Sequence, residues 1–189
     1  MSSTLSPLAL LVLELLAERD MHPYELRQLL LTRGRDKHVK ITPGSLYRTV
    51  ERLTEESLAQ VVETNREGRR PERTVYRVTD AGREAFAFRL REMLSRPATE
   101  YPQYPTALAC AHALPRADAL DQLTRRQLEL QAELARVQTV YDQLRQQGSV
   151  YLIDIDYSQA MRRAELAWTS QLINDMTSGR VQWPEEACT

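Results

Sequence analysis

The side chains with the clearest chemistry in this sequence are basic and lie close together. Six Lys or Arg residues and only two acids fall from Arg33 to Arg52, and four more arginines fall from Arg66 to Arg73. Clusters of this kind bind phosphate groups, and the overall charge of a chain does not reveal them. The whole chain has a formal net charge of −1, so the sequence indicates local recognition of a polyanion.

Motifs for catalysis and metal binding are missing from the sequence. It has no Gly-rich phosphate loop, nucleophile elbow or HExxH motif, so we expect neither enzyme activity nor a cofactor. Cys110 and Cys188 are far apart, and the three histidines lack ligand spacing, so no disulfide framework or metal site is expected. The apolar run 8–13 is too short to span a membrane and lacks signal-peptide features, so we expect a cytoplasmic protein with no membrane partner.

A predicted helix positions the first basic cluster. Thr42 and Pro43 give a capping residue followed by proline at the first helical position. Leu46, Val50 and Leu53 share one face, and Tyr47 lies on the flank. The roughly opposite face carries small and basic residues: Gly44, Ser45, Arg48 and Arg52. This composition is typical of a helix that enters a DNA major groove, and the small residues allow close approach of a phosphate.

The neighbouring elements predict a winged helix-turn-helix. Two helices precede this one, beginning at Ser6-Pro7 and at Pro23. Two strands, 58–64 and 74–79, follow it with the second basic cluster in the turn between them. The first helix is apolar nearly all round, so we expect an interface on its far side that includes Leu8.

The prolines at 97, 102 and 105 mark a boundary in the chain. We expect a mainly α-helical protein with a winged-helix domain over residues 1–95, an irregular linker over 96–105, and a helical region for dimerisation and effector sensing over 106–189. Charge divides similarly, because residues 1–95 have a net charge of +2 and residues 96–189 have −3.

A heptad stripe runs along the long helix predicted for 119–147. Its members are spaced alternately by three and four residues: Leu120, Leu123, Gln127, Leu130, Leu134, Val137, Tyr141 and Leu144. Burial of the seven apolar members is worth about 10 kcal/mol, so the stripe needs a facing helix. One candidate is the helix 157–178, with Met161, Ala164, Trp168, Leu172 and Met176 as its stripe. The other is a second copy of the chain, and both alternatives remain open.

Four motifs resemble the PadR family of bacterial transcriptional regulators. They are Tyr24-Glu25-Leu26, Gly44-Ser45-Leu46-Tyr47, Glu51-Arg52-Leu53 and the run from Tyr76 to Gly82. The resemblance is carried by residues 5–95 and continues over 106–178 in architecture only. This sequence departs from the family at Arg48, where tyrosine and proline are common, and at Ser57, where a glycine often ends the helix. We expect Ser57 to leave that helix end weakly capped.

The resemblance implies a homodimeric repressor that binds an inverted-repeat operator in double-stranded DNA and regulates an adjacent operon. It also implies release by a small aromatic or hydrophobic effector. Thr42 and Gly44 at the start of the helix are expected DNA contacts from their position. Lys37 and Lys40 either contact phosphates or lie in a loop that is simply hydrated, and both alternatives remain open. Carried over by position, the DNA contacts are Tyr24, Ser45, Tyr47, Arg48, Arg52, Arg69, Arg70 and Arg73. In this list Tyr24, Ser45 and Tyr47 touch phosphates, Arg48 and Arg52 reach bases or phosphates, and the last three place the wing over a minor groove.

Partner and effector contacts are expected in the C-terminal helices. The dimer interface would contain Leu8, Leu120, Leu123, Leu130, Leu134, Val137, Tyr141, Leu144 and Trp168. An effector would meet Trp168, Tyr157 and Met161, although Trp168 also suits a core position opposite the long helix. The alternative function is a protein-interaction module, in which the winged helix binds another protein and the long helix is a scaffold.

Overall fold

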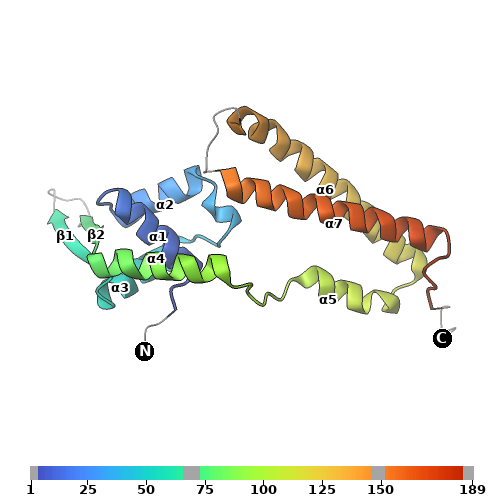
Figure 1. Ribbon diagram of the computed structural model, residues 1–189, viewed down its shortest axis with the longest axis horizontal. Coiled ribbons are helices and arrows are strands. Elements are labelled where there is room, and N and C mark those ends of the chain that lie inside the picture. The colour runs from blue at the N-terminus through green and yellow to red at the C-terminus, as the bar shows by residue number, and fades with distance from the viewer. Residues whose placement is uncertain (1–3, 66–72, 146–151, 185–189) are drawn as a thin grey trace. The chain divides into compact units, whose positions relative to one another are not determined.

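The computed structural model describes residues 4–65, 73–145 and 152–184, and the chain divides into two compact units, Met1–Glu100 and Tyr101–Thr189. Each unit is described by itself. Helices dominate both, and the described residues form one sheet of two antiparallel strands (Figure 1). The predicted mainly helical fold with a winged helix is confirmed. None of the helices in the described ranges is long and apolar enough to cross a membrane.

The first helix, α1 (Pro7–Glu18), lies at the centre of the N-terminal unit. It begins where the Ser6 hydroxyl accepts a hydrogen bond from the Ala9 N–H at 3.3 Å. Four elements of the same unit contact it: α2 (Pro23–Thr32), α3 (Pro43–Glu55), β2 (Arg73–Val78) and α4 (Asp80–Ser95). Leu8 is therefore only 6% exposed and belongs to this core, contrary to the expectation of an interface there.

The second and third helices are fixed by their caps. Nδ1 of His22 accepts a hydrogen bond from the Tyr24 N–H at 3.0 Å at the start of α2. At the start of α3, the Thr42 hydroxyl accepts from the Ser45 N–H at 3.1 Å. A short 3₁₀ helix, η1 (Arg35–Lys37), lies between the two. The predicted apolar face of α3 is confirmed, because Leu46, Val50 and Leu53 are at most 1% exposed.

The end of α3 is well capped despite the absence of glycine. Ser57 has a left-handed backbone conformation with φ of 59°, which residues other than glycine rarely adopt. The Leu58 N–H donates to the Leu53 carbonyl at 2.8 Å and the Ser57 N–H donates to the Thr54 carbonyl at 3.0 Å. These two bonds form a Schellman motif. The expectation of a weak cap is wrong, since Ser57 takes the glycine conformation and bears its strain.

The wing is held by the loop between α1 and α2. Strand β1 (Ala59–Asn65) pairs with β2 so that Ala59 lies opposite Val78, with a bulge between Val61 and Glu63. Met21 and Tyr76 exchange two backbone hydrogen bonds, at 3.0 and 3.1 Å. This isolated β-bridge ties the loop between α1 and α2 to the base of the wing.

Helix α4 approaches the backbone of Leu58, the residue before β1, very closely. The Thr79 hydroxyl caps α4 by accepting from the Gly82 N–H at 3.0 Å. A Cβ atom at Gly82 would lie 2.0 Å from the carbonyl oxygen of Leu58. Glycine is therefore required here by contact with backbone.

The C-terminal unit contains α5 (Gln103–Cys110), a 3₁₀ turn η2 (Ala111–Ala113), α6 (Arg116–Arg145) and α7 (Ile153–Thr177). Pro105 lies in the first turn of α5, where the missing N–H of proline is tolerated. The irregular linker therefore ends at Pro102, three residues earlier than expected.

Helices α6 and α7 pack side by side within the chain (Figure 1). Leu123 and Leu130 of the heptad stripe are each 8% exposed, whereas the side chains of Tyr141 and Leu144 lie outside the described residues. The expected stripe on α7 is correct only at Leu172 and Met176, which join the cluster around Leu123.

The other residues of the expected α7 stripe face solvent. Trp168 and Met161 are both 50% exposed, and Ala164 is also exposed. The face of α7 turned toward α6 carries Ser170, whose hydroxyl accepts a hydrogen bond from the Gln127 amide at 2.7 Å. Trp168 therefore does not fill the core opposite α6.

Candidate nucleic-acid interface

The start of α3 presents an open backbone surface. Gly44 is exposed, and a Cβ atom built there would meet no atom within 4 Å. Nothing in the described chain therefore requires glycine at this position. A small residue at an exposed helix N-terminus leaves room for close approach of a partner, and the helix dipole favours an anionic one.

Ser45 is already engaged in the cap of the same helix. Its hydroxyl accepts from the Thr42 N–H and donates to the Thr42 carbonyl, both at 3.0 Å. Ser45 and Thr42 thus fix the first turn of α3 before any contact with DNA. Their predicted contacts with phosphate stay predictions.

Arg48 and Arg52 diverge although they are one turn apart. Arg48 is exposed, and its Nε donates to the Gly44 carbonyl at 3.2 Å. Arg52 is only partly exposed, and its Nη2 donates to the Ser6 hydroxyl at 3.4 Å. Arg52 therefore joins α3 to the cap of α1, and Arg48 is the arginine of α3 that remains beside Gly44.

The basic residues before α3 also fall into two groups, those that pair with acids of the same unit and those that do not. Arg33 makes a bidentate ion pair with Glu18, in which Nη2 of Arg33 lies 2.8 Å from one carboxylate oxygen. Hydrogen bonding to Arg33 lowers the pKa of Glu18. Arg35 pairs with Glu14 at 3.8 Å. Lys37 and Lys40 are exposed and make no ion pair with any residue that the structure describes. They are the charges of this loop left for an outside anion.

Two exposed tyrosines lie on α2 and α3. Tyr24 in the first turn of α2 is 55% exposed, and Tyr47 on the flank of α3 is 43% exposed. The imidazole of His22 meets the Tyr47 ring edge-on, with 6.5 Å between ring centres. The cap of α2 and the flank of α3 are thereby brought into one surface, which offers two phenol hydroxyls to phosphate oxygens.

Few of the arginines predicted in the wing can be placed in the candidate interface. Arg69 and Arg70 lie outside the described residues, and Arg73 is placed only as a backbone position in β2. The base of the wing is anchored, however, because Arg77 binds both carboxylate oxygens of Asp20, at 2.8 and 2.5 Å. These hydrogen bonds lower the pKa of Asp20 and raise that of Arg77.

The far end of α3 has the opposite charge. Glu51, Glu55 and Glu56 lie along its last turns, and a small hollow of about 280 Å³ separates the first two from Val61 and Tyr76. Burial, and then the charge of Glu51, raises the pKa of the Tyr76 hydroxyl. A polyanion is therefore favoured at the Gly44 end of α3 and disfavoured at the Glu55 end.

The expected effector residues lie on one surface of α7. Tyr157 is 66% exposed, and it lies on the same side as Met161 and Trp168. The edge of Trp168 meets the ring of Tyr104 with 6.4 Å between ring centres. No group of metal-binding side chains occurs in the described parts of the chain.

Sequence reasoning missed the residues that brace the interface. The Arg52–Ser6 and Arg77–Asp20 contacts join positions 46 and 57 residues apart, and no local pattern marks them. The one available signal was the surplus of arginines over what DNA contacts would use.

Residues 12–88 match the model of the transcriptional regulator PadR-like family. No curated protein matches the chain.

Several solved structures share the fold over most of the chain at low sequence identity. Bacillus subtilis PadR in complex with operator DNA has 18% identity and a TM-score of 0.72, covering 90% of this chain and 99% of the other. The same protein with p-coumaric acid has 15% identity and a TM-score of 0.66, covering 92% and 98%. The Vibrio cholerae virulence activator AphA has 18% identity and a TM-score of 0.68, covering 90% and 98%.

Proposed function

We propose that this chain, whose residues 12–88 match the model of the PadR-like family of transcriptional regulators, is a homodimeric DNA-binding repressor of the operon adjacent to its gene. Proteins of this family regulate transcription and are not enzymes. The main observation in support of DNA binding is the start of α3, where Gly44 leaves open space beside Arg48. Lys37 and Lys40 add charges that no described acid neutralises.

A single copy of this surface offers a short contact with DNA. Two copies related by a two-fold axis would place their α3 helices in successive major grooves, about 34–36 Å apart on an inverted repeat. The outward apolar side chains of α7 support such pairing, because they are spaced by four, four, three and four residues: Ile153, Tyr157, Met161, Ala164 and Trp168. Exposed apolar stripes of this length are typical of helix-to-helix interfaces.

Control by a small aromatic effector completes the proposal. The related PadR structure with p-coumaric acid supports a ligand of this class, and the structure with operator DNA supports the DNA partner. Repression is proposed as the output. Because a regulator of the same fold is described as an activator, the direction of control is part of the test.

The test is binding of the full-length protein to the intergenic DNA beside its gene and to a shuffled sequence of equal length. We expect preference for the intergenic DNA and a slope of log K against log salt of about −7 to −9, from four or five phosphate contacts in each copy. A slope near zero, or equal affinity for both DNAs, contradicts the proposal and favours a protein-interaction module. Transcription from the adjacent promoter with added protein then gives the direction of control.

A further inference from the structure

The chain folds back on itself after α7, and we call residues 178–184 the strap. It turns at Gly179, which has a φ of 77°, and the Val181 N–H then donates to the Asp175 carbonyl at 3.1 Å. Val181 and Trp183 pack against the apolar cluster that α6 and α7 share. The strap is therefore a folded part of the C-terminal unit.

One hydrogen bond ties the strap to the segment that follows α5. Nε1 of Trp183 donates to the Leu114 carbonyl at 2.9 Å, although the two residues are 69 positions apart. Leu114 ends the turn η2, and its own N–H donates to the Ala111 carbonyl at 3.0 Å. Cys110, the last residue of α5, comes directly before this turn and is exposed. The strap is therefore fastened only a short turn away from an exposed thiol.

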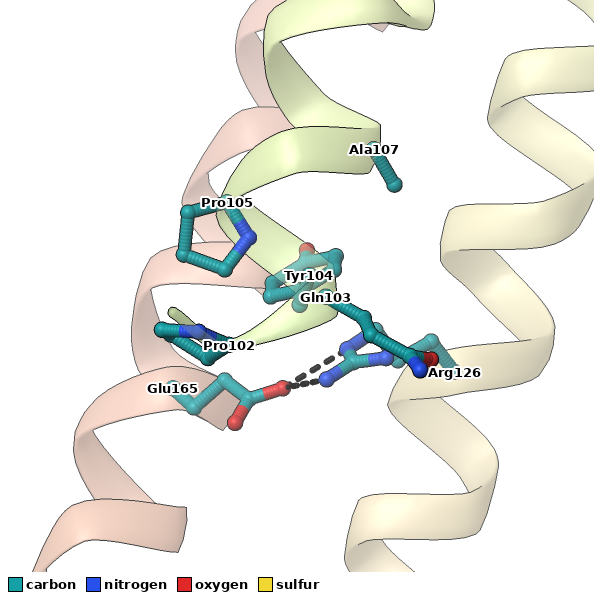
Figure 2. A pocket seen from close by; sticks show the side chains of 7 residues that line it. All are labelled: Pro102, Gln103, Tyr104, Pro105, Ala107, Arg126 and Glu165. Atoms are coloured by element: carbon teal, nitrogen blue, oxygen red, sulfur yellow. Dashed lines mark hydrogen bonds and ion pairs between the residues drawn. The ribbon is translucent and has the colours of Figure 1, made fainter. Parts of the chain in front are cut away.

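The first turn of α5 is anchored separately. The guanidinium of Arg126 stacks on the ring of Tyr104, with Cζ 3.5 Å from the ring centre, and Nε of Arg126 donates to Glu165 at 2.6 Å. Figure 2 shows these three side chains at the edge of a hollow of about 630 Å³. The Tyr104 hydroxyl also makes a 3.2 Å hydrogen bond with the hydroxyl of Thr169. Because one end of α5 is held to α6 and α7, the cysteine at its other end has a defined place in the unit.

The second cysteine of the chain follows the strap. Cys188 lies outside the described residues, and five residues lead to it from Trp183. Five residues span up to about 17 Å in an extended chain. The turn from Cys110 to Leu114 rises about 8 Å, and the Cα atoms of a disulfide lie about 4–7 Å apart. Chain length therefore lets Cys188 reach Cys110 while Trp183 stays on Leu114.

We propose that Cys110 and Cys188 form a reversible disulfide that locks the strap onto the end of α5. The oxidant is a low-molecular-weight disulfide. One protein thiol loses its proton and attacks this disulfide, which releases one small thiolate. The second protein thiol loses its proton and attacks the mixed disulfide, which releases the other, and the two small thiolates take up the two protons. Two protein thiols are oxidised to one disulfide, and one small disulfide is reduced to two thiols.

The strap sets how readily this bond forms. Trp183 holds the chain beside Leu114 and so raises the effective concentration of one thiol at the other. The two cysteines are far apart in the sequence, so the pairing depends on the return of the strap and has no local signal. In a reducing compartment such a bond forms transiently and reports an oxidising change. It belongs to the C-terminal unit alone, so its test does not depend on DNA binding.

The experiment equilibrates the full-length protein in glutathione buffers of increasing glutathione disulfide content. Free thiols are trapped with N-ethylmaleimide and counted by mass spectrometry, and digestion identifies the linked peptides. We expect a bond between Cys110 and Cys188 within one chain, and none in Cys110→Ser or Cys188→Ser. The oxidised native protein should melt about 5 °C higher than the reduced one, because the bond closes a long loop. Neither serine variant should show this shift.

The role of the strap has its own variants. Trp183→Ala should lower the equilibrium constant for the disulfide about tenfold, which moves the midpoint potential by about 30 mV. Gln182→Ala, at an exposed position of the strap, is the matched control and should behave like the native protein. Trp183→Phe keeps the ring and loses the N–H donor, so it should lie between native and Trp183→Ala, and it carries the test if the alanine variant does not fold.

Three results would overturn the proposal. The first is disulfides that join only separate copies of the chain. The second is oxidation that stops at mixed disulfides with glutathione. The third is an equilibrium constant in the folded Trp183 variants equal to that of the native protein.

Discussion

Gly44 and Arg48 show how single residues divide folding from recognition. The space around Gly44 is empty, so its lack of a side chain contributes nothing to packing. Arg48 lies one turn further on and has no acid partner among the described residues. Packing within the described chain therefore does not require glycine at position 44, and no described acid neutralises Arg48.

A first prediction concerns Gly44. Gly44→Ala should raise the free energy of unfolding by about 0.5 kcal/mol, because alanine favours the helix. It should also weaken binding to intergenic DNA, because the added methyl group blocks close approach of the backbone. Chemical denaturation and fluorescence anisotropy measure the two effects.

Gly34→Ala is the control for this pair of effects. Gly34 has a φ of 68°, so alanine there should lower the free energy of unfolding by about 1 kcal/mol. DNA affinity of the folded Gly34 variant should be unchanged. Loss of stability in Gly44→Ala would mean that Gly44 serves the fold.

A second prediction separates the two arginines of α3. Arg48→Ala should reduce discrimination between intergenic and shuffled DNA by about 1–3 kcal/mol and leave the melting temperature unchanged. Arg52→Ala should lower the melting temperature, because it removes the bond to Ser6, and should leave discrimination intact. Anisotropy on both DNAs, with thermal melts, tests this. Equal loss of discrimination in both variants would show that Arg52, like Arg48, contacts the DNA.

At the scale of the element, the ends of helices and strands carry the strain and the anchors. The Schellman motif after α3 requires a left-handed residue, and the wing requires the Asp20–Arg77 pair and the Met21–Tyr76 bridge. Each makes a separate prediction about stability.

Ser57→Gly should stabilise the protein by about 1 kcal/mol, because glycine adopts the left-handed conformation without strain. Urea denaturation measures the change. Ser57→Ala is the matched control and should bring no gain, since it keeps the Cβ atom. Higher stability of the alanine variant would show that loss of the hydroxyl, and not relief of backbone strain, causes the change.

The anchor of the wing should depend on pH. Arg77 lowers the pKa of Asp20 in the folded state, so the pair stabilises the fold above about pH 4 and loses this effect as pH falls through the lowered pKa. Asp20→Asn should therefore be less stable than the native protein at pH 7, and the difference should shrink on acidification.

Urea denaturation between pH 2.5 and pH 7 tests this dependence. Asp36→Asn is the control, at an exposed aspartate of η1. A constant difference between native protein and Asp20→Asn across this range would show that the ion pair does not hold the wing.

At the scale of the whole molecule, α7 has two faces with different tasks. Thr169 and Met176 are buried against the rest of the C-terminal unit, whereas Tyr157, Met161 and Trp168 face outward. A long helix with apolar residues on both sides has one face satisfied by its own chain and a second left for a partner.

Met161→Glu should therefore convert the proposed dimer to a monomer, because it places a charge in the outward stripe. The expected readout is a light-scattering mass that falls from twice the 21.8 kDa chain mass to the chain mass itself. DNA affinity should fall with it. Asn174→Glu, an exposed position outside the stripe, should remain dimeric. A monomeric native protein would contradict the pairing of α7.

Local signals account for what could be predicted from the sequence. Ser6-Pro7, Thr42-Pro43 and Thr79 mark helix starts because capping depends only on neighbouring residues. The heptad stripe of α6 is equally local. The basic face of α3 was predicted as a set, but the bond from Arg52 to Ser6 depends on tertiary structure.

Two larger errors have one physical cause. The far side of α1, including Leu8, was assigned to an interface, and Trp168 was considered for a core position. Hydrophobicity indicates that a side chain will be covered without indicating by what. In this chain, α1 is covered by its own unit, and the inward face of α7 carries Ser170, Leu172 and Met176 and leaves Trp168 half exposed.

The contact between Gly82 and Leu58 has a consequence for how this protein can change over generations. With only 2.0 Å available to a Cβ atom, no second residue at position 82 leaves the path of the backbone intact. Any substitution at position 82 requires the backbone to move, whereas Gly44 can be replaced, and later restored, without cost to the fold. Variation at position 82 would mark a chain that has abandoned this wing, and variation at position 44 would mark one that has changed what it recognises.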